Sequence, residues 1–319
     1  MKAHQRLIRE AKALTPEPNE DLKREAARSF ENARVGEISR EEAESVIMEY
    51  EWLQNMGSSR FYYGLFFGPF LGGVACFGAT GGSNSHASLC GEQYSHRVVT
   101  LTRGACVHWA DPPRISSDGR IHGGAAASYL ISNACKAMAQ RGFHAFIGFA
   151  DPAAGEEGIV YRASNWLYCG LSSPTEEFRW TGKPVENDQG RDWKDGEWHN
   201  CRLIHAYTRN RVNRRLLRSL VHHGFTDDQG KAIRGSRKHP YVQHQTRSQQ
   251  RAQMMAEGFD FRIGHPKGRF VRFEGDKRIV KELRAALRWK VEAYPQRSQS
   301  RNEQSEGSLV AANMLELVE

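Results

Sequence analysis

The chain of 319 residues lacks the sequence signatures of several protein classes. Its six cysteines form no CxxC pair, and no C-x-x-C with a later H-x-x-x-H is present, which argues against a zinc finger and a disulfide framework. The cysteines are Cys76, Cys90, Cys106, Cys135, Cys169 and Cys201. Most of them stand in apolar stretches, so we expect small core residues in a reducing compartment.

Long uncharged segments are also scarce. The N-terminal residues are charged and contain no apolar stretch, which argues against a secretory signal and predicts a cytoplasmic protein. Only residues 61–82 are uncharged over a length that could span a membrane. The Gly68-Pro69 step divides this run, so we predict a hairpin of two buried strands, Phe61–Phe67 and Leu71–Phe77, and no membrane partner.

What the chain has in excess is positive charge. The formal net charge is +8 and the pI is about 9.2, which favours a polyanionic partner. Residues 201–251 hold 12 Lys/Arg against 2 Asp, together with five His. This segment predicts a DNA-contacting surface, with a solvated charged face as the alternative. Its candidate DNA-binding residues are Arg209, Arg211, Arg214, Arg215, Arg218, Arg234, Arg237 and Lys238.

Hydrophobic periodicity predicts helices and strands in an α/β order. Ser39 and Glu42 form a capping-box pattern at the start of a helix over residues 39–56. After the hairpin we expect strand Val98–Trp109, helix Ala125–Arg141, strand Phe143–Ala150, a short helix over 158–166, strand Gly268–Phe273 and helix Asp276–Trp289. This order predicts a mixed sheet flanked by helices.

The domain organisation follows from changes in composition along the chain. Residues 1–38 form a polar lead-in, and residues 39–295 form the α/β domain. Within that domain, residues 201–262 are a basic insertion before the last strand–helix unit. Residues 296–319 are rich in Gln, Ser and Glu and are predicted to be a disordered tail.

The loop before the helix at residue 125 is a candidate anion cradle. Glycines at a helix start allow backbone N–H groups to approach a phosphate, and the helix dipole favours negative charge there. The loop lacks the GK[ST] of a P-loop and the spaced glycines of a Rossmann fingerprint. Its R-x-x-G-x-A spacing resembles the acyl-CoA loop of GNAT-fold acyltransferases, although a surface turn would also explain it. The candidate cofactor-binding residues are Arg120, Gly123, Gly124 and Ala125.

Two residues after that helix are candidates for proton transfer. Asp151 ends an apolar strand, and Tyr161 follows in the short helix. The GNAT resemblance implies that a polar group at this strand end faces the gap where acceptor and acyl group meet. It also implies that a tyrosine in the next helix protonates the CoA thiolate. An acceptor amine needs a group to take its proton, which makes Asp151 the candidate base. The alternatives are a cap on loop 151–157 for Asp151 and a core role for Tyr161.

Several segments together resemble a particular family. LTRGACVHWA, AAASYLIS, FADPAAGEEGIVYRASNWLYCG and GRFVRFEGDKRIVKELRAALRWKVEAYP are similar to segments of the Mom family of phage DNA-modification proteins. That family is GNAT-related and alters adenine in phage DNA by N6-adenine carbamoylmethylation, which blocks restriction enzymes. The resemblance implies a transferase in the host cytoplasm, with DNA as substrate and acetyl-CoA or a related acyl-CoA as cofactor.

The resemblance also assigns site residues. Arg103, Ser128, Asp151 and Tyr161 match family positions, and we expect Asn165 to orient the acceptor. One position departs: members carry His and an aromatic residue on the first helix, where this chain has Glu51-Trp52. No metal-ligand set is evident, and the metal requirement and oligomeric state stay open.

Two other functions stay open at this point. One is acetylation of an amine on a hypermodified pyrimidine or a protein. The other is DNA binding by an inactive GNAT core.

Overall fold

The computed structural model describes residues 4–15, 17–79, 85–111, 114–115, 121–122, 125–174, 176–182, 198–200, 247–256 and 258–295. The chain divides into two compact units. Unit 1 comprises Met1–Ser172 and Lys267–Glu319, and unit 2 comprises Ser173–Pro266.

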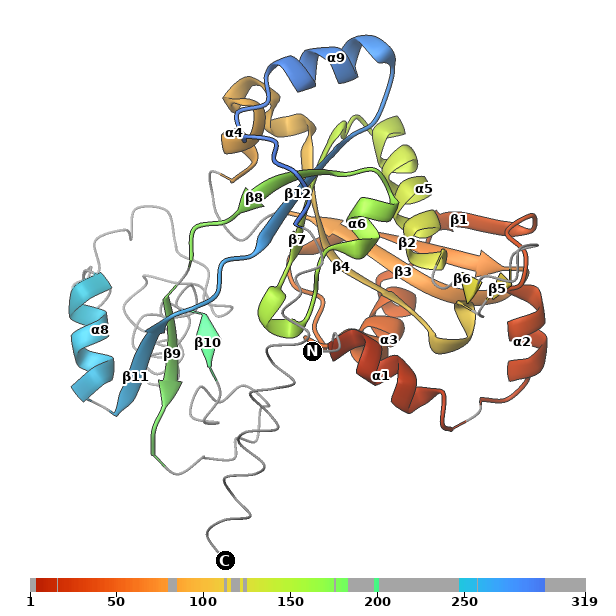
Figure 1. Cartoon of the computed structure of the whole chain (residues 1–319), viewed down its shortest axis with the longest axis horizontal. Coiled ribbons are helices and arrows are strands. Elements are labelled where there is room, and N and C mark those ends of the chain that lie inside the picture. The colour runs from red at the N-terminus through yellow and green to blue at the C-terminus, as the bar shows by residue number, and fades with distance from the viewer. Residues whose placement is uncertain are drawn as a thin grey trace, which may run out of the picture. The chain divides into compact units, whose positions relative to one another are not determined.

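Unit 1 contains a seven-stranded mixed sheet with helices packed on it (Figure 1). Its strands are β1 (Ala33–Glu37), β2 (Ser59–Phe67), β3 (Phe70–Gly78), β4 (Val98–Cys106), β7 (Ala145–Ala150), β8 (Leu167–Leu171) and β12 (Gly268–Phe273). Its helices are α1 (His4–Lys12), α2 (Glu20–Ala26), α3 (Arg40–Tyr50), α4 (Ser85–Cys90), α5 (Ala126–Gln140), α6 (Ile159–Ala163) and α9 (Lys277–Ala285). Short 3-10 turns η1 (Glu92–Arg97), η2 (His108–Ala110) and η3 (Pro152–Ala154) and a small ribbon of β5 (Arg114–Ile115) and β6 (Ile121–His122) complete it.

The strand order is β1-β2-β3-β4-β7-β12-β8, and β4 and β7 are its one parallel pair. Their ladder joins Val98–Thr100 to Ala145–Ile147. Beyond it, β4 continues to Cys106 on β3, whereas β7 continues to Ala150 on β12. The two strands therefore diverge toward their C-terminal ends.

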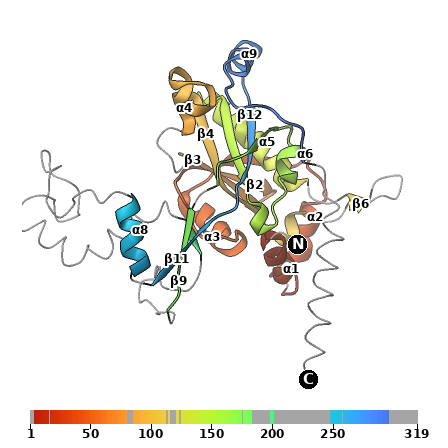
Figure 2. The same ribbon diagram turned by 60° about the vertical axis from the view of Figure 1, so that its left-hand side comes forward.

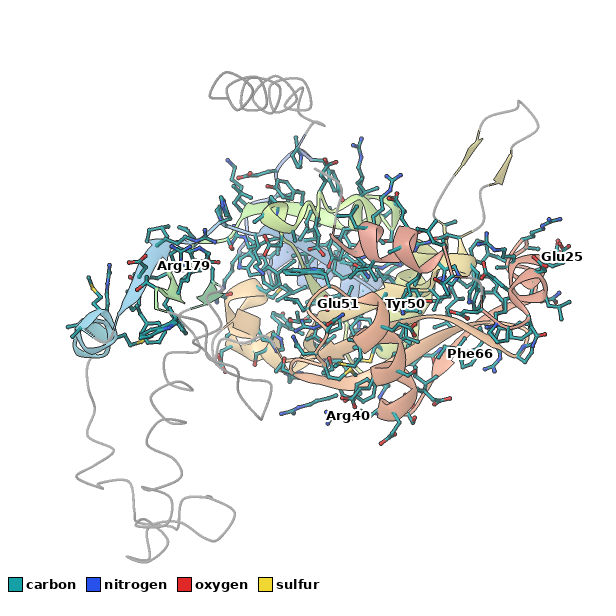
Figure 3. All side chains as sticks on the ribbon, turned by 90° about the horizontal axis from the view of Figure 1, so that it is seen from below. Glu25, Arg40, Tyr50, Glu51, Phe66 and Arg179 are labelled. Atoms are coloured by element: carbon teal, nitrogen blue, oxygen red, sulfur yellow. The ribbon has the colours of Figure 1, made fainter. Side chains whose placement is uncertain are left out.

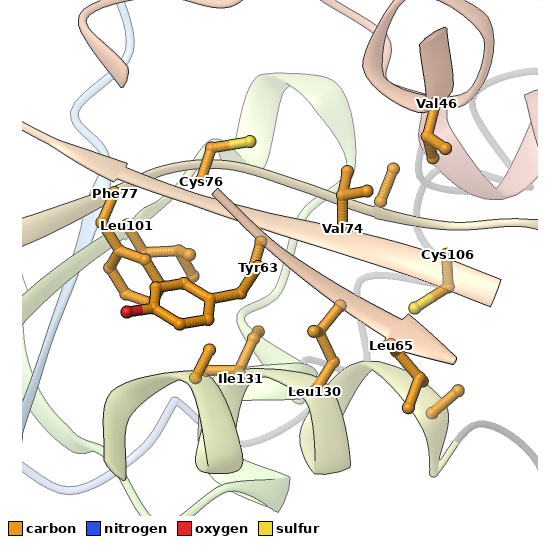
Figure 4. Packing of buried hydrophobic residues seen from close by; sticks show 14 of the residues in the cluster. Val46, Tyr63, Leu65, Val74, Cys76, Phe77, Leu101, Cys106, Leu130 and Ile131 are labelled. Carbon is orange, nitrogen blue, oxygen red and sulfur yellow. The ribbon is translucent and has the colours of Figure 1, made fainter. Parts of the chain in front are cut away.

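The main core lies on both faces of this sheet, because strand side chains alternate. Figure 4 shows Leu130 and Ile131 of α5 beneath β2 and β3, with Val46 of α3 on the opposite side. All three side chains are buried. The capping box predicted for α3 is present: Ser39 Oγ accepts from Glu42 N–H, and the Glu42 carboxylate accepts from Ser39 N–H.

A second cluster joins α4 and α9 near the β7–β12 part of the sheet (Figure 2). Ile279 and Leu283 of α9 are buried there, and Ala286 and Leu287 just after it pack at the edge, so the helix turns an apolar face to this cluster. Asp276 caps this helix by accepting from Ile279 N–H. The backbone N–H of Arg288 donates to Leu89 O at 2.8 Å and links the segment after α9 to α4.

Unit 2 is built on a three-stranded sheet in the order β10 (His199–Asn200), β9 (Glu176–Trp180), β11 (Phe259–Ile263). Helix α8 (Arg247–Ala256) contributes Met254 to a small core with Phe178 and Phe259.

Several sequence predictions are confirmed. The uncharged run forms the β2–β3 hairpin, and the strand predicted at Gly268–Phe273 is β12. Five of the six cysteines are free and buried, and Cys201 lies outside the described residues. Burial raises the pKa of Cys76 and Cys106 to about 12. Among the described residues, no helix is both long and apolar enough to cross a membrane.

Other boundaries differ from the prediction. Helix α3 ends at Tyr50 instead of continuing to residue 56, and β4 gives way to a 3-10 turn at His108. Residues within the predicted lead-in of 1–38 form two helices and strand β1, which pairs with β2. The α/β sheet therefore begins at Ala33, before the predicted domain start at residue 39. Residues 296–319 lie outside the described residues.

A polar network attaches the N-terminal helices to the core. His108, whose side chain is 2% exposed, places Nε2 3.3 Å from Glu20 Oε2 and Nδ1 2.9 Å from the Tyr50 hydroxyl. Glu20 also accepts from Glu17 N–H at 2.9 Å. That hydrogen bond, followed by those from Arg24 and His108, lowers the pKa of Glu20 from 4.5 to about 2 against the effect of burial.

Glu20 is therefore predicted to contribute an acid-sensitive part of the stability. A carboxyl whose pKa is lowered in the folded state stabilises above its unfolded pKa, and the effect is lost as pH falls from 4.5 toward 2. Glu20→Gln is expected to lower the urea midpoint at pH 7, with a difference from wild type that shrinks over this range. Glu25→Gln, on the exposed side of α2, serves as control. An equal effect of both substitutions at pH 7 would contradict the prediction.

Candidate active site

Five ionisable residues lie at or beside the place where β4 and β7 diverge: Glu51, Arg103, Asp151, Glu156 and Tyr161. Arg103 lies on β4 beyond the last residue pair with β7. Its Nε donates to Asn55 O at 2.7 Å and lies 3.9 Å from Glu51 Oε2. The Arg103 and Glu51 side chains are only 17% and 8% exposed. The arginine is thus held by the segment that follows α3 and faces a buried carboxylate.

Glu51 occupies the position after the C-terminal end of α3, beside Tyr50 (Figure 3). Its Oε2 accepts from Leu53 N–H at 2.8 Å. Burial raises the pKa of Glu51, the Arg103 charge opposes this effect, and the negative charge of Glu156 adds to it. Glu51 is therefore electrostatically linked to both sides of the divergence.

Asp151, which follows β7, uses both carboxylate oxygens. Oδ1 accepts from Ala153 N–H at 3.0 Å and caps η3, and Oδ2 lies 2.9 Å from Lys267 Nζ. The capping contact agrees with the structural alternative considered from the sequence. The ion pair additionally ties Asp151 to the segment that precedes β12.

Glu156 was missed as a candidate from the sequence. Its Oε2 accepts from Asp151 N–H at 2.8 Å, and its Oε1 accepts from Trp52 Nε1–H at 3.1 Å. Burial raises the pKa of Glu156, the Asp151 charge adds to the rise, and the hydrogen bonds and Lys267 oppose it. The sequence signal was the Gly-Glu-Glu stretch after the strand end, which alone does not separate a buried glutamate from an exposed one.

Tyr161 on α6 lies across β7 with 7% of its surface exposed. Its ring stacks on Phe270 at a centroid distance of 4.6 Å, and its hydroxyl donates to Phe149 O at 3.1 Å. Burial raises the pKa of Tyr161, and the nearby Glu156 charge adds to this rise. Tyr161 is therefore a core aromatic residue. Its hydroxyl, which stays protonated, lies near the end of β7.

Two glycines permit this placement. A Cβ on Gly148 of β7 would lie 2.5 Å from Tyr161 Cε1. Gly158 begins α6 with φ of +71°, a conformation that favours glycine, and a Cβ there would meet the Phe270 ring at 2.2 Å. Glycine at position 158 is therefore required both by the positive φ and by the closeness of the Phe270 ring on which Tyr161 stacks.

The remaining catalytic candidates have local structural roles. Ser128 Oγ donates to Ala125 O at 3.0 Å within the first turn of α5. Asn165 is exposed and has φ of +58°, a left-handed conformation that asparagine adopts more readily than most residues. No described hydrogen bond joins Ser128 or Asn165 to Arg103, Glu51 or Glu156.

The predicted phosphate cradle is described only at its end. Arg120, Gly123 and Gly124 lie outside the described residues, whereas Ala125 precedes the first turn of α5. The next N–H, of Ala126, donates to Asp111 Oδ1 at 2.8 Å, and Asp111 Oδ2 lies 3.2 Å from Arg9 Nη2. One N–H at the positive end of α5 therefore already has a carboxylate partner.

The eight predicted DNA-binding residues between Arg209 and Lys238 also lie outside the described residues. In the described part of unit 2, Trp198 lies under two guanidinium groups, those of Arg262 at 4.1 Å and Arg179 at 4.7 Å from its ring centroid. Glu177 and Asp260 pair with these two arginines. Among the described residues, no group of three or more His, Cys, Asp and Glu is arranged to hold a metal ion.

A family model matches most of the chain. The model of the Mom protein family matches residues 32–258, from β1 to the end of unit 2's α8. The chain belongs to the Mom protein family. The Mom resemblance predicted from the sequence is confirmed, and membership indicates an enzyme of phage DNA modification. The matched region includes the basic segment and all the site residues except Lys267, and it ends before β12. No curated protein matches the chain.

The contact between Gly148 and Tyr161 generates a stability prediction for this Mom family member. Gly148→Ala is expected to cost about 1–3 kcal/mol of unfolding free energy, because a methyl group would force the tyrosine ring aside. The measurement is urea unfolding at pH 7. Gly104→Ala on β4 is the control, since its nearest contact would be an ordinary 3.6 Å. Equal stability of the two variants would contradict the described packing.

Proposed function

We propose that this Mom family protein transfers an acyl-derived group from a CoA thioester to the exocyclic amine of adenine in DNA. The modification would protect phage DNA from host restriction. The observation that carries the proposal is the divergence of β4 and β7, with Arg103, Glu51, Asp151, Glu156 and Tyr161 at or beside it.

The strand arrangement supports a GNAT-like reaction centre. Helix α5 connects β4 to β7, and the two parallel strands separate after Thr100 and Ile147. In a GNAT-like enzyme such a separation admits the acyl group from one side and the acceptor from the other. An adenine in duplex DNA would have to be flipped out to reach this gap.

The reaction requires two proton movements. As the amine nitrogen bonds to the carbonyl carbon of the thioester, the carbon–sulfur bond breaks, the amine gives up a proton and the thiolate takes one, which leaves an N-acyl adenine and free CoA thiol. Tyr161 is the candidate for the second step because its hydroxyl carries a proton at neutral pH and lies at the end of β7, where it donates to Phe149 O. The carboxylates of Asp151 and Glu156 supply acceptors for the first. Arg103 adds positive charge beside Glu51.

The donor would be acetyl-CoA or a related acyl-CoA. Arg120 and the backbone N–H groups of Gly123, Gly124 and Ala125 are the proposed pyrophosphate contacts. Because Ala126 N–H already donates to Asp111, the glycine N–H groups would carry most of this binding. Ser128 and Asn165 are proposed to contact the donor and the acceptor. The basic residues from Arg209 to Lys238 are proposed to bind DNA phosphates.

Nucleoside mass spectrometry of plasmid DNA from expressing cells tests this function. Wild type is expected to yield a new adenine adduct whose mass identifies the transferred group. Tyr161→Phe is expected to lower adduct yield by about 10²-fold or more, the usual range for loss of a general acid. It should cost only about 1 kcal/mol of stability, because the ring stack stays and one hydrogen bond is lost.

Tyr168→Phe is the matched control, because Tyr168 is also a buried tyrosine packed on Phe270. No adduct on any base from wild type would refute the proposed function. An adduct on a modified pyrimidine would instead identify the acetyltransferase alternative. Salt-dependent DNA binding that is equal in wild type, Asp151→Ala and Tyr161→Phe, without any adduct, would identify a DNA-binding protein with an inactive core.

A further inference from the structure

We propose that Glu156 is the proton acceptor for the adenine amine, and that Asp151 is a positioning residue that holds Glu156 in place. This assignment rests on the function proposed above. It follows from how the two carboxylates at the end of β7 are engaged.

Asp151 is committed to structure through both of its oxygens. One oxygen caps η3 through Ala153 N–H, and the other pairs with Lys267 at 2.9 Å. Taking up a proton would weaken an ion pair and a helix-capping contact at once.

Glu156 is held differently. Its two oxygens receive N–H donors from two elements, Asp151 N at the end of β7 and Trp52 Nε1 in the segment after α3. The loop between Asp151 and Glu156 is closed a second time by Glu156 N–H donating to Asp151 O at 3.0 Å. Both of these partners are neutral N–H groups, so a proton on Glu156 would break no ion pair, whereas a proton on Asp151 would weaken its pair with the Lys267 ammonium.

The surroundings of Glu156 also favour proton uptake. Burial raises the pKa of Glu156, and the neighbouring Asp151 charge adds to the effect. Asp151 and Glu51 are the acidic groups whose charges couple to Glu156, and Lys267 is the basic one, while Arg103 acts on Glu51. A carboxylate whose pKa is raised accepts a proton more readily than one at its ordinary value.

Glu156 and Tyr161 can complete a proton cycle. The amine proton passes to Glu156 as the nitrogen–carbon bond forms. The Tyr161 hydroxyl proton passes to the departing thiolate as the carbon–sulfur bond breaks. The proton on Glu156 then returns to the Tyr161 phenolate, so that the net products are the substituted amine and a free thiol. The Glu156 charge contributes to the raised pKa of Tyr161, so the two groups are electrostatically coupled.

Five proteins test the assignment: wild type, Glu156→Gln, Glu156→Asp, Asp151→Asn and Trp52→Phe. Each purified protein is incubated with plasmid DNA and the low-molecular-weight extract of cells in which the plasmid becomes modified, from pH 5 to 9. Adduct formation is followed by nucleoside mass spectrometry. Glu157→Gln is the control, because Glu157 is the exposed neighbour in the chain. Thermal unfolding checks that each variant is folded.

Glu156→Gln is expected to lose about 10²-fold or more of the adduct, with Glu156→Asp keeping part of it and Glu157→Gln matching wild type. The wild-type rate should fall on the acid side as Glu156 becomes protonated. Asp151→Asn removes a charge that raises the pKa of Glu156, so this limb should move to lower pH. Trp52→Phe removes a hydrogen bond that lowers the pKa of Glu156, so the acid-side fall in rate should move to higher pH.

Activity of Glu156→Gln within about threefold of wild type, with complete loss in Asp151→Asn, would overturn the assignment in favour of Asp151. An unshifted acid limb in both Asp151→Asn and Trp52→Phe would overturn it as well. If Glu156→Gln does not fold, Glu156→Asp and Trp52→Phe decide the question. An inactive wild type would refute the proposed function itself, which separates that failure from failure of this assignment.

Discussion

The short parallel ladder between β4 and β7 is the constraint on which the rest of the site depends. Three residue pairs join the strands, after which each follows a different neighbour. Side chains from β4 and from the end of β7 can then face a common space without backbone pairing between them. Because the hairpin β2–β3 supports β4 and the C-terminal strand β12 supports β7, the divergence requires both ends of the chain.

Buried and partly buried carboxylates gather at this divergence at an energetic cost. Glu51 and Glu156 both have raised pKa values, because burial disfavours their charged forms. Only a few neighbouring groups oppose this effect. Arg103 offsets Glu51, and two N–H donors offset Glu156. Proteins retain such groups at functional sites more often than elsewhere, so their presence together with Mom family membership supports a reaction centre here.

Glu51 and Trp52, which follow α3, contact residues on both sides of the divergence between β4 and β7. After α3, this chain has a carboxylate, Glu51, that lies 3.9 Å from Arg103, and an indole, Trp52, that donates to Glu156. Both residues therefore join the segment after α3 to the two diverging strands. The acid–base properties of the gap depend on this segment as well as on β7 and α6.

Local patterns in the sequence determined much of the fold. The Ser39 capping box, the Gly68-Pro69 hairpin, β12 and the apolar face of α9 all follow from rules that act over a few residues. So does the presence of Asp151 and Tyr161 on consecutive elements.

Only the tertiary structure decided that Asp151 forms an ion pair with Lys267 and that Glu156 is bound by neutral N–H donors. Lys267 reaches Asp151 and Trp52 reaches Glu156 across more than a hundred residues of chain, and no local rule encodes such contacts. Strand β1 in the N-terminal region depends likewise on β2 as partner. Burial and charge environment are properties of packing, so they set the pKa of a side chain only once the chain has folded.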